Sequence, residues 1–141
     1  MSDVVGTWSL VSYRLVGSRG RERFPYGEDA VGCLLYSADG SMAVSIMSRQ
    51  RHQFRGKDIL RRTTEEAAEA TRTYLSYCGT YTVQGCSVIH HVNLSLFPNW
   101  TGTDQVRYFR LTGDLLELST APIGSQESAP RAELVWRRKT W

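Results

Sequence analysis

The chain has 141 residues, of which 41% are hydrophobic and 22% charged, and its formal net charge is +3. This length and balance fit one soluble domain, residues 1–141, that is large enough to bury a core. The charge is too weak to indicate a nucleic-acid-binding protein, and no stretch approaches the roughly 20 apolar residues of a membrane span.

The first residues, MSDVVGTWSL, contain no basic segment followed by an apolar run, so we expect no secretory signal. The three cysteines, Cys33, Cys78 and Cys86, are then expected to be reduced thiols, since their odd number does not suit a closed set of disulfides. We therefore expect a cytoplasmic protein that binds neither nucleic acid nor a membrane.

The first half of the chain predicts three strands. Residues 6–16 are rich in Trp, Val, Leu and Tyr, which favour a strand. Residues 31–37 and 41–47 flank Asp39-Gly40, a tight-turn signal, and predict a hairpin. In the first strand, alternation gives one face to Trp8, Leu10 and Ser12 and the other to Val11, Tyr13 and Leu15.

Residues 63–79 predict one helix. Thr63 and Glu66 fit a capping box at its start, and Gly79 suits its end. The expected buried stripe, at helical spacing, consists of Ala67, Ala70, Thr71, Tyr74, Leu75 and Cys78.

The remaining residues predict strands over 79–84, 86–97, 104–111, 115–120 and 131–138. About eight strands in meander order, with one inserted helix, predict an all-β, mainly antiparallel fold that closes into a barrel. Closure is favourable because it removes exposed sheet edges. A barrel of this size can hold one small ligand.

Particular residues resemble a known family. Gly6-Thr7-Trp8 resembles the Gly-x-Trp signature of lipocalins, and Arg137 resembles the arginine that packs across that tryptophan to close the barrel base. The longer pattern is similar to small bacterial and fungal lipocalin-like domains of the calycin type. The resemblance implies a calyx that binds small hydrophobic molecules, and it implies no catalytic motif. It rests on FPYGEDAVGCLLYSADGSMAVSIM, YLSYCGTYTV, HHVNLSLFPNWTGTDQVRYF and LVWRR.

His90 is the first candidate site residue. It shares a strand face with Val88, Val92 and Leu94, which is the more apolar face and so the expected barrel interior, whereas His91 points the other way. His90 is then either a buried, hydrogen-bonded histidine or an acid/base that contacts the ligand. No second metal ligand follows at a recognisable spacing, so we expect neither a metal nor another cofactor.

The strand and turn after His90 supply further candidates. In the turn, Asn99 and Trp100 are expected to cap one barrel end or form a rim that gates the ligand. Of Arg107 and Tyr108, one faces inward: Tyr108 would offer a hydroxyl, and Arg107 would need a carboxylate or an anionic ligand. Further pocket hydroxyls could come from Tyr36, Tyr74, Tyr77 and Tyr81.

The segment before the helix is strongly basic. We expect Arg49–Arg62 to be either a solvated loop beside the acidic helix start or a docking patch for an anionic ligand or an acidic protein. With the helix it is expected to lie near one barrel opening as a lid. The basic side chains are Arg49, Arg51, His52, Arg55, Lys57, Arg61 and Arg62, against Asp58.

Two functions follow from these expectations. The first is binding of a small hydrophobic metabolite, of the natural-product type, in the calyx. The second is a cofactor-free cyclase, isomerase or dehydratase that holds a lipophilic substrate in a reactive conformation, with His90 or a tyrosine such as Tyr108 moving a proton. Polar groups that converge on one point of the cavity would favour the enzyme, and a smooth apolar cavity would favour binding.

Overall fold

The computed structural model describes residues 3–124 and 129–139. Helix α1 spans Thr64–Arg72, and a short 3-10 helix, η1, spans Pro98–Trp100. The strands are β1 Gly6–Val16, β2 Glu22–Arg23, β3 Val31–Tyr36, β4 Ser41–Met47, β5 Tyr74–Gln84, β6 Ser87–Ser95, β7 Asp104–Thr112, β8 Leu115–Ser119 and β9 Arg131–Arg138.

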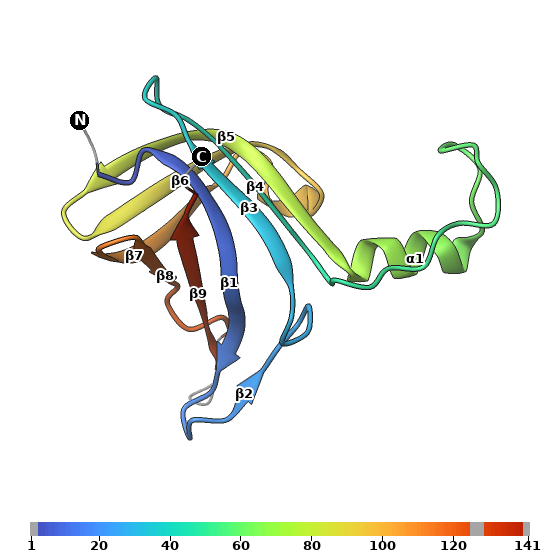
Figure 1. The fold of residues 1–141 in the computed structure, drawn as a ribbon, viewed down its shortest axis with the longest axis horizontal. Coiled ribbons are helices and arrows are strands. Elements are labelled where there is room, and N and C mark those ends of the chain that lie inside the picture. Colours follow the sequence, from blue (N-terminus) through green and yellow to red (C-terminus); the bar gives the residue numbers. More distant parts are fainter. Residues whose placement is uncertain (1–2, 125–128, 140–141) are drawn as a thin grey trace.

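The strands form one closed antiparallel barrel (Figure 1). Each strand from β3 to β8 pairs with the next along the chain, and β1 pairs with both β3 and β9, so the sheet closes on itself. The short β2 pairs only with the end of β1, which leaves eight strands in the wall. The predicted all-β, eight-stranded barrel with one inserted helix is confirmed.

Inward side chains fill the barrel where the strands alternate regularly. Val44 and Ile46 on β4 and Leu134 and Trp136 on β9 are buried, while their sequence neighbours are more exposed. Each fully buried aliphatic side chain of this kind contributes roughly 1.5–3 kcal/mol of hydrophobic free energy. The core therefore lies inside the wall.

Strand β1 departs from the predicted alternation at a bulge. Its register against β9 shifts between Leu10 and Ser12. Leu10 packs on the core, and after the shift Tyr13 does too, whereas Val11 is exposed. The predicted faces are right as far as Leu10 and wrong beyond it, because a bulge inserts one extra residue and exchanges the two faces.

One end of the barrel is closed by Arg138. Its guanidinium lies over the Trp8 ring, 4.3 Å from the ring centroid, and donates to the carbonyls of Val5 and Asp3 at 2.7 Å each. Gly6 lies under this group with a φ of +145°, and a Cβ there would lie 2.7 Å from Arg138 Nη1. The N-terminal segment is thereby tied across the barrel base.

The arginine expected in this role, Arg137, is the wrong one. It follows the inward Trp136 directly, so it points outward, where it pairs with Asp114 at 3.7 Å. The side chain that returns to the interior is the next but one, Arg138, because side chains alternate along a strand.

The helix is shorter than predicted. The capping box of Thr63 and Glu66 is confirmed, but α1 ends at Arg72. Tyr74 and Leu75 instead pair with Met47 and Ile46 of β4, so the end of the predicted helix is a strand of the barrel wall. Gly79 is a strand residue at a bulge rather than a helix stop, and a Cβ on it would lie 1.9 Å from the His91 carbonyl oxygen.

The helix and the loop before it form an arm that extends away from the barrel (Figure 1). Arg51 anchors its base, donating to the Ala70 carbonyl at 3.0 Å and lying over the Tyr74 ring. The loop then follows α1, where Glu66 accepts from the Arg55 amide and Glu69 bonds His52. No helix among the described residues is long and apolar enough to cross a membrane.

The two neighbouring arginines on β9 provide a test of the barrel closure. Arg138→Met should lower the free energy of unfolding by about 2–4 kcal/mol, because it removes two charge-assisted hydrogen bonds and the stacking on Trp8. Arg137→Met removes only an exposed ion pair and should change stability by less than about 0.5 kcal/mol. Urea unfolding of both variants measures this, and equal losses would contradict the assignment.

Candidate functional site

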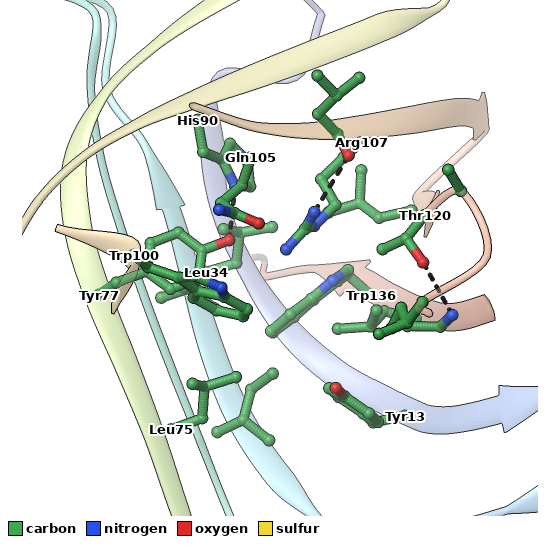
Figure 2. A pocket seen from close by; sticks show the side chains of 18 residues that line it. Tyr13, Leu34, Leu75, Tyr77, His90, Trp100, Gln105, Arg107, Thr120 and Trp136 are labelled. Carbon is green, nitrogen blue, oxygen red and sulfur yellow. Dashed lines mark hydrogen bonds between the residues drawn. The ribbon is translucent and has the colours of Figure 1, made fainter. Parts of the chain in front are cut away.

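The barrel encloses a cavity of about 400 Å³ (Figure 2). Ala121 and Ile123, in the loop after β8, line it and are exposed, so the cavity reaches solvent at that end. Most of the wall is apolar, and its aliphatic side chains include Leu34, Val44, Ile46, Leu75, Leu118 and Leu134.

Aromatic and polar side chains complete the lining. Trp100 comes from η1 and Trp136 from β9, so two indoles from distant parts of the chain line one space. Trp100 is held in place by edge contacts with the Tyr77 and Phe97 rings, at centroid distances of 5.6 and 5.5 Å. The polar lining residues are Tyr13, Tyr77, His90, Gln105, Arg107 and Thr120.

His90 lies between two tyrosines. Its Nε2 is 2.5 Å from the Tyr36 hydroxyl, and its Nδ1 is 2.7 Å from the Tyr77 hydroxyl. The three residues come from β3, β5 and β6, and all three are buried. We call Tyr36, His90 and Tyr77 the buried triad. Both ring nitrogens of His90 are therefore satisfied without a ligand.

The buried triad is electrically neutral near neutral pH. Burial, with a smaller effect of the nearby positive charge of Arg107, lowers the pKa of His90 to about 3. Burial also raises the pKa of Tyr77 and, more strongly, that of Tyr36, because an ionised phenolate would lose its hydration. The triad thus favours a hydrogen-bonding role over proton transfer.

Arg107 is the inward residue of the pair that the sequence left open. Figure 2 shows its guanidinium directed into the cavity, and its Nη1 donates to the Val106 carbonyl at 3.1 Å. The guanidinium carbon lies 6.0 Å from the centroid of the Trp100 ring. Among the described residues that line the cavity, Arg107 is the only charged one.

The comparisons with known proteins agree with this architecture. The family profile described as a lipocalin-like domain matches residues 5–139. The chain belongs to the lipocalin-like domain family. It is also 39% identical, over 106 residues, to a protein of Aspergillus oryzae named 4'-hydroxy-3'-methoxypropiophenone carrier protein; the match covers 69% of this chain and 96% of that protein.

In this lipocalin-like barrel Tyr108 is not a cavity residue. It is 46% exposed and points outward, because it alternates with the inward Arg107 on β7. The expectation that its hydroxyl meets the ligand is therefore wrong. His91 also faces outward, where it bonds Thr82 and Asp104 at 2.8 and 2.7 Å.

Four other candidates lie outside the cavity. Tyr36 is behind His90 and reaches the cavity only through it. Tyr81 donates to the Ser37 carbonyl, and Tyr74 lies under Arg51 at the base of the arm. Asn99 is exposed on η1, so only Trp100 of that turn lines the cavity.

The arm does not form the expected lid. Of the cavity-lining residues, none belongs to residues 48–73, which extend away from the barrel (Figure 1). Its acidic side chains Glu66 and Glu69 instead hold the basic loop against α1. Within the described part of the chain, no group of three or more His, Cys, Asp or Glu is placed to hold a metal ion.

The sequence did not reveal Tyr13 as a lining residue, because the bulge in β1 turns it to the other strand face. Tyr77 was expected as a possible pocket hydroxyl and does line the cavity, although from β5 rather than from the predicted helix. Trp136 carries a usable signal, since it shares one face of β9 with the apolar Leu134. Gln105 shares a face of β7 with Arg107, so its direction depends on how β7 pairs with β6.

The pKa of His90 makes stability depend on pH. The pKa of a histidine in the unfolded chain is 6.5, whereas that of His90 in the folded protein is about 3. Between these two values the unfolded chain binds a proton at His90 and the folded protein does not. Stability should therefore fall as the pH falls. From about pH 7 to about pH 5, the wild type should lose roughly 2 kcal/mol more than His90→Gln, whose amide stays neutral.

Urea unfolding at several pH values measures this difference. Both proteins retain the same carboxylates and the other two histidines, so the comparison isolates His90. Parallel pH profiles for the two proteins would show that His90 is not held neutral by burial.

Proposed function

We propose that this protein binds a small lipophilic aromatic compound, of the aryl ketone class, inside its barrel. The observation that carries the proposal is the cavity, whose 400 Å³ and mostly apolar wall suit a compound of that size. The relative from Aspergillus oryzae, a carrier protein named for an aryl ketone, supports the same class.

The lining suits an aromatic ligand in particular. Trp100 and Trp136 offer flat faces for ring contacts, which stabilise aromatic pairs by about 0.5–1.5 kcal/mol beyond the burial of area. Tyr13, Tyr77 and Gln105 add hydrogen-bonding groups that can orient a carbonyl or hydroxyl oxygen. Few polar groups in an apolar wall are typical of a specific binding pocket.

A cofactor-free cyclase, isomerase or dehydratase is the alternative, and it has weaker support. Polar groups do converge on the cavity, as an enzyme requires. However, a histidine with a pKa of about 3 is a weak base, and tyrosines with raised pKa values are weak acids near neutral pH. We therefore propose a binding protein.

Two other expectations stay predictions. The first is the cytoplasmic location, which the three free cysteines would suit. The second is the contact of Arg49–Arg62 with an anionic or acidic partner, for which the exposed Arg61 and its neighbours on the arm would be available.

Blocking the cavity mouth tests the proposed function. Titration with 4'-hydroxy-3'-methoxypropiophenone, followed by calorimetry, should show one site per chain. Ala121→Trp should weaken binding at least ~10-fold, because the indole would occupy the mouth where Ala121 lines the cavity. Leu35→Trp places the same group on the outer face of β3, where Leu35 is exposed, and should leave binding unchanged.

The two variants also define the opposing result. If both variants bind the compound as tightly as the wild type does, the compound binds outside the barrel. Mass spectrometry of the native protein purified from its source would in addition reveal any captured compound by its mass.

A further inference from the structure

We propose that the compound bound in the barrel carries an ionised oxygen acid, a phenolate or a carboxylate, which pairs with Arg107. This inference rests on the proposed function, since it names the chemical class of the ligand of the same cavity. It starts from a charge inside an apolar wall.

Arg107 lacks an acidic partner among the described residues that line the cavity. A guanidinium has five N–H donors, and those of Arg107 meet neutral acceptors, the Val106 carbonyl at 3.1 Å and the Tyr77 hydroxyl oxygen. No Asp or Glu lines the cavity among the described residues. Arg107 is partly buried, and an anion that enters the cavity would supply the counter-charge that the lining does not, through charge-assisted hydrogen bonds.

Arginines on the outside of the wall differ from Arg107 in this respect. Arg110, three residues further on β7, pairs with Glu117 at 3.8 Å. Arg14 on β1 pairs with Glu22 and with Glu133, and Arg131 on β9 also contacts Glu133. In the described part of the chain, these outward arginines therefore have carboxylate partners and the inward Arg107 has none.

The cavity lining also contains a buried donor that has no acceptor in the described structure. Trp136 is fully buried and lines the cavity, yet its indole Nε1–H has no hydrogen-bond partner in the described structure. Buried donors are rarely left unpaired, and such a group indicates a missing acceptor. An acidic oxygen in the cavity would be an acceptor of the required kind.

The buried triad adds a third donor. Neutral His90 donates from one ring nitrogen and accepts at the other. Tyr36 lies outside the cavity, and its hydroxyl forms one hydrogen bond in the described structure, to His90 Nε2. The Tyr36 hydroxyl proton is therefore satisfied if Tyr36 donates it to Nε2. His90 Nδ1–H then donates to the Tyr77 oxygen, and the Tyr77 proton is left to point toward a ligand.

The lining therefore offers Arg107, Trp136 and Tyr77 as donors to one acceptor-rich group. An acyl phenol has a suitable chemistry, because its conjugated carbonyl spreads the negative charge of the phenolate and so favours ionisation. A lipophilic carboxylate has the same charge and acceptor oxygens. Both are recognised through a charge-assisted hydrogen bond to a guanidinium.

A matched pair of fluorescent probes tests the inference. 1-Anilinonaphthalene-8-sulfonate carries a permanent anionic group, and N-phenyl-1-naphthylamine has the same rings without it. Wild-type protein should bind the sulfonate at least ~10-fold more tightly than the neutral probe, because only the sulfonate can pair with Arg107. Arg107→Gln should reduce that preference to about 2-fold or less and leave the neutral probe unaffected.

Arg110→Gln is the control, since it removes an arginine from the outer face of the same strand and should retain the full preference. A wild-type protein that binds both probes equally, with no effect of Arg107→Gln, would overturn the inference and leave the proposed function intact. Failure to bind either probe or the aryl ketone would contradict both.

Two further pairs of compounds distinguish a phenolate ligand from a carboxylate ligand. 4'-Hydroxy-3'-methoxypropiophenone and its O-methyl ether differ in the ability to ionise, as do 4-phenylbutyrate and its methyl ester. Tighter binding of the phenol than of its ether above the phenol pKa would assign a phenolate. Preference for the carboxylate alone would assign a carboxylate, and preference for neither acid would contradict the proposed pairing.

Discussion

The pairing of β1 with β9 is the contact on which the rest of this structure depends. It turns a row of strands into a closed wall, and a closed wall has no unpaired edge and has an inside. Arg138 then fastens the N-terminal segment across the base, so that the interior opens at the other end. The cavity is therefore a product of closure at the seam and at the base together.

Inside this wall two kinds of polar group behave differently. The buried triad satisfies both nitrogens of His90, and its neutrality suits the apolar interior. Arg107 is the opposite case, a permanent positive charge that no Asp or Glu neutralises among the described residues that line the cavity. An anionic ligand would supply the missing negative charge, and its charge-assisted hydrogen bond to the guanidinium would add to the affinity.

The sequence predicted the fold well because strand alternation, the Asp39-Gly40 turn and the capping box at Thr63 are local signals. It failed where long-range pairing decides the structure. Pairing with β4 converted Tyr74–Cys78 from helix to strand, and the bulge in β1 turned Tyr13 inward. The choice between Arg107 and Tyr108, and the role of Arg138 in place of Arg137, depend on strand register, which no single segment reveals.

A crystal structure of the protein with 4'-hydroxy-3'-methoxypropiophenone, grown above the pKa of the phenol, would test the central claim most directly. The account predicts one molecule inside the barrel with its phenolate oxygen within about 3 Å of the Arg107 guanidinium. A molecule bound outside the wall, or one inside it with the phenolate directed to the solvent at the Ala121 mouth and no contact with Arg107, would contradict it.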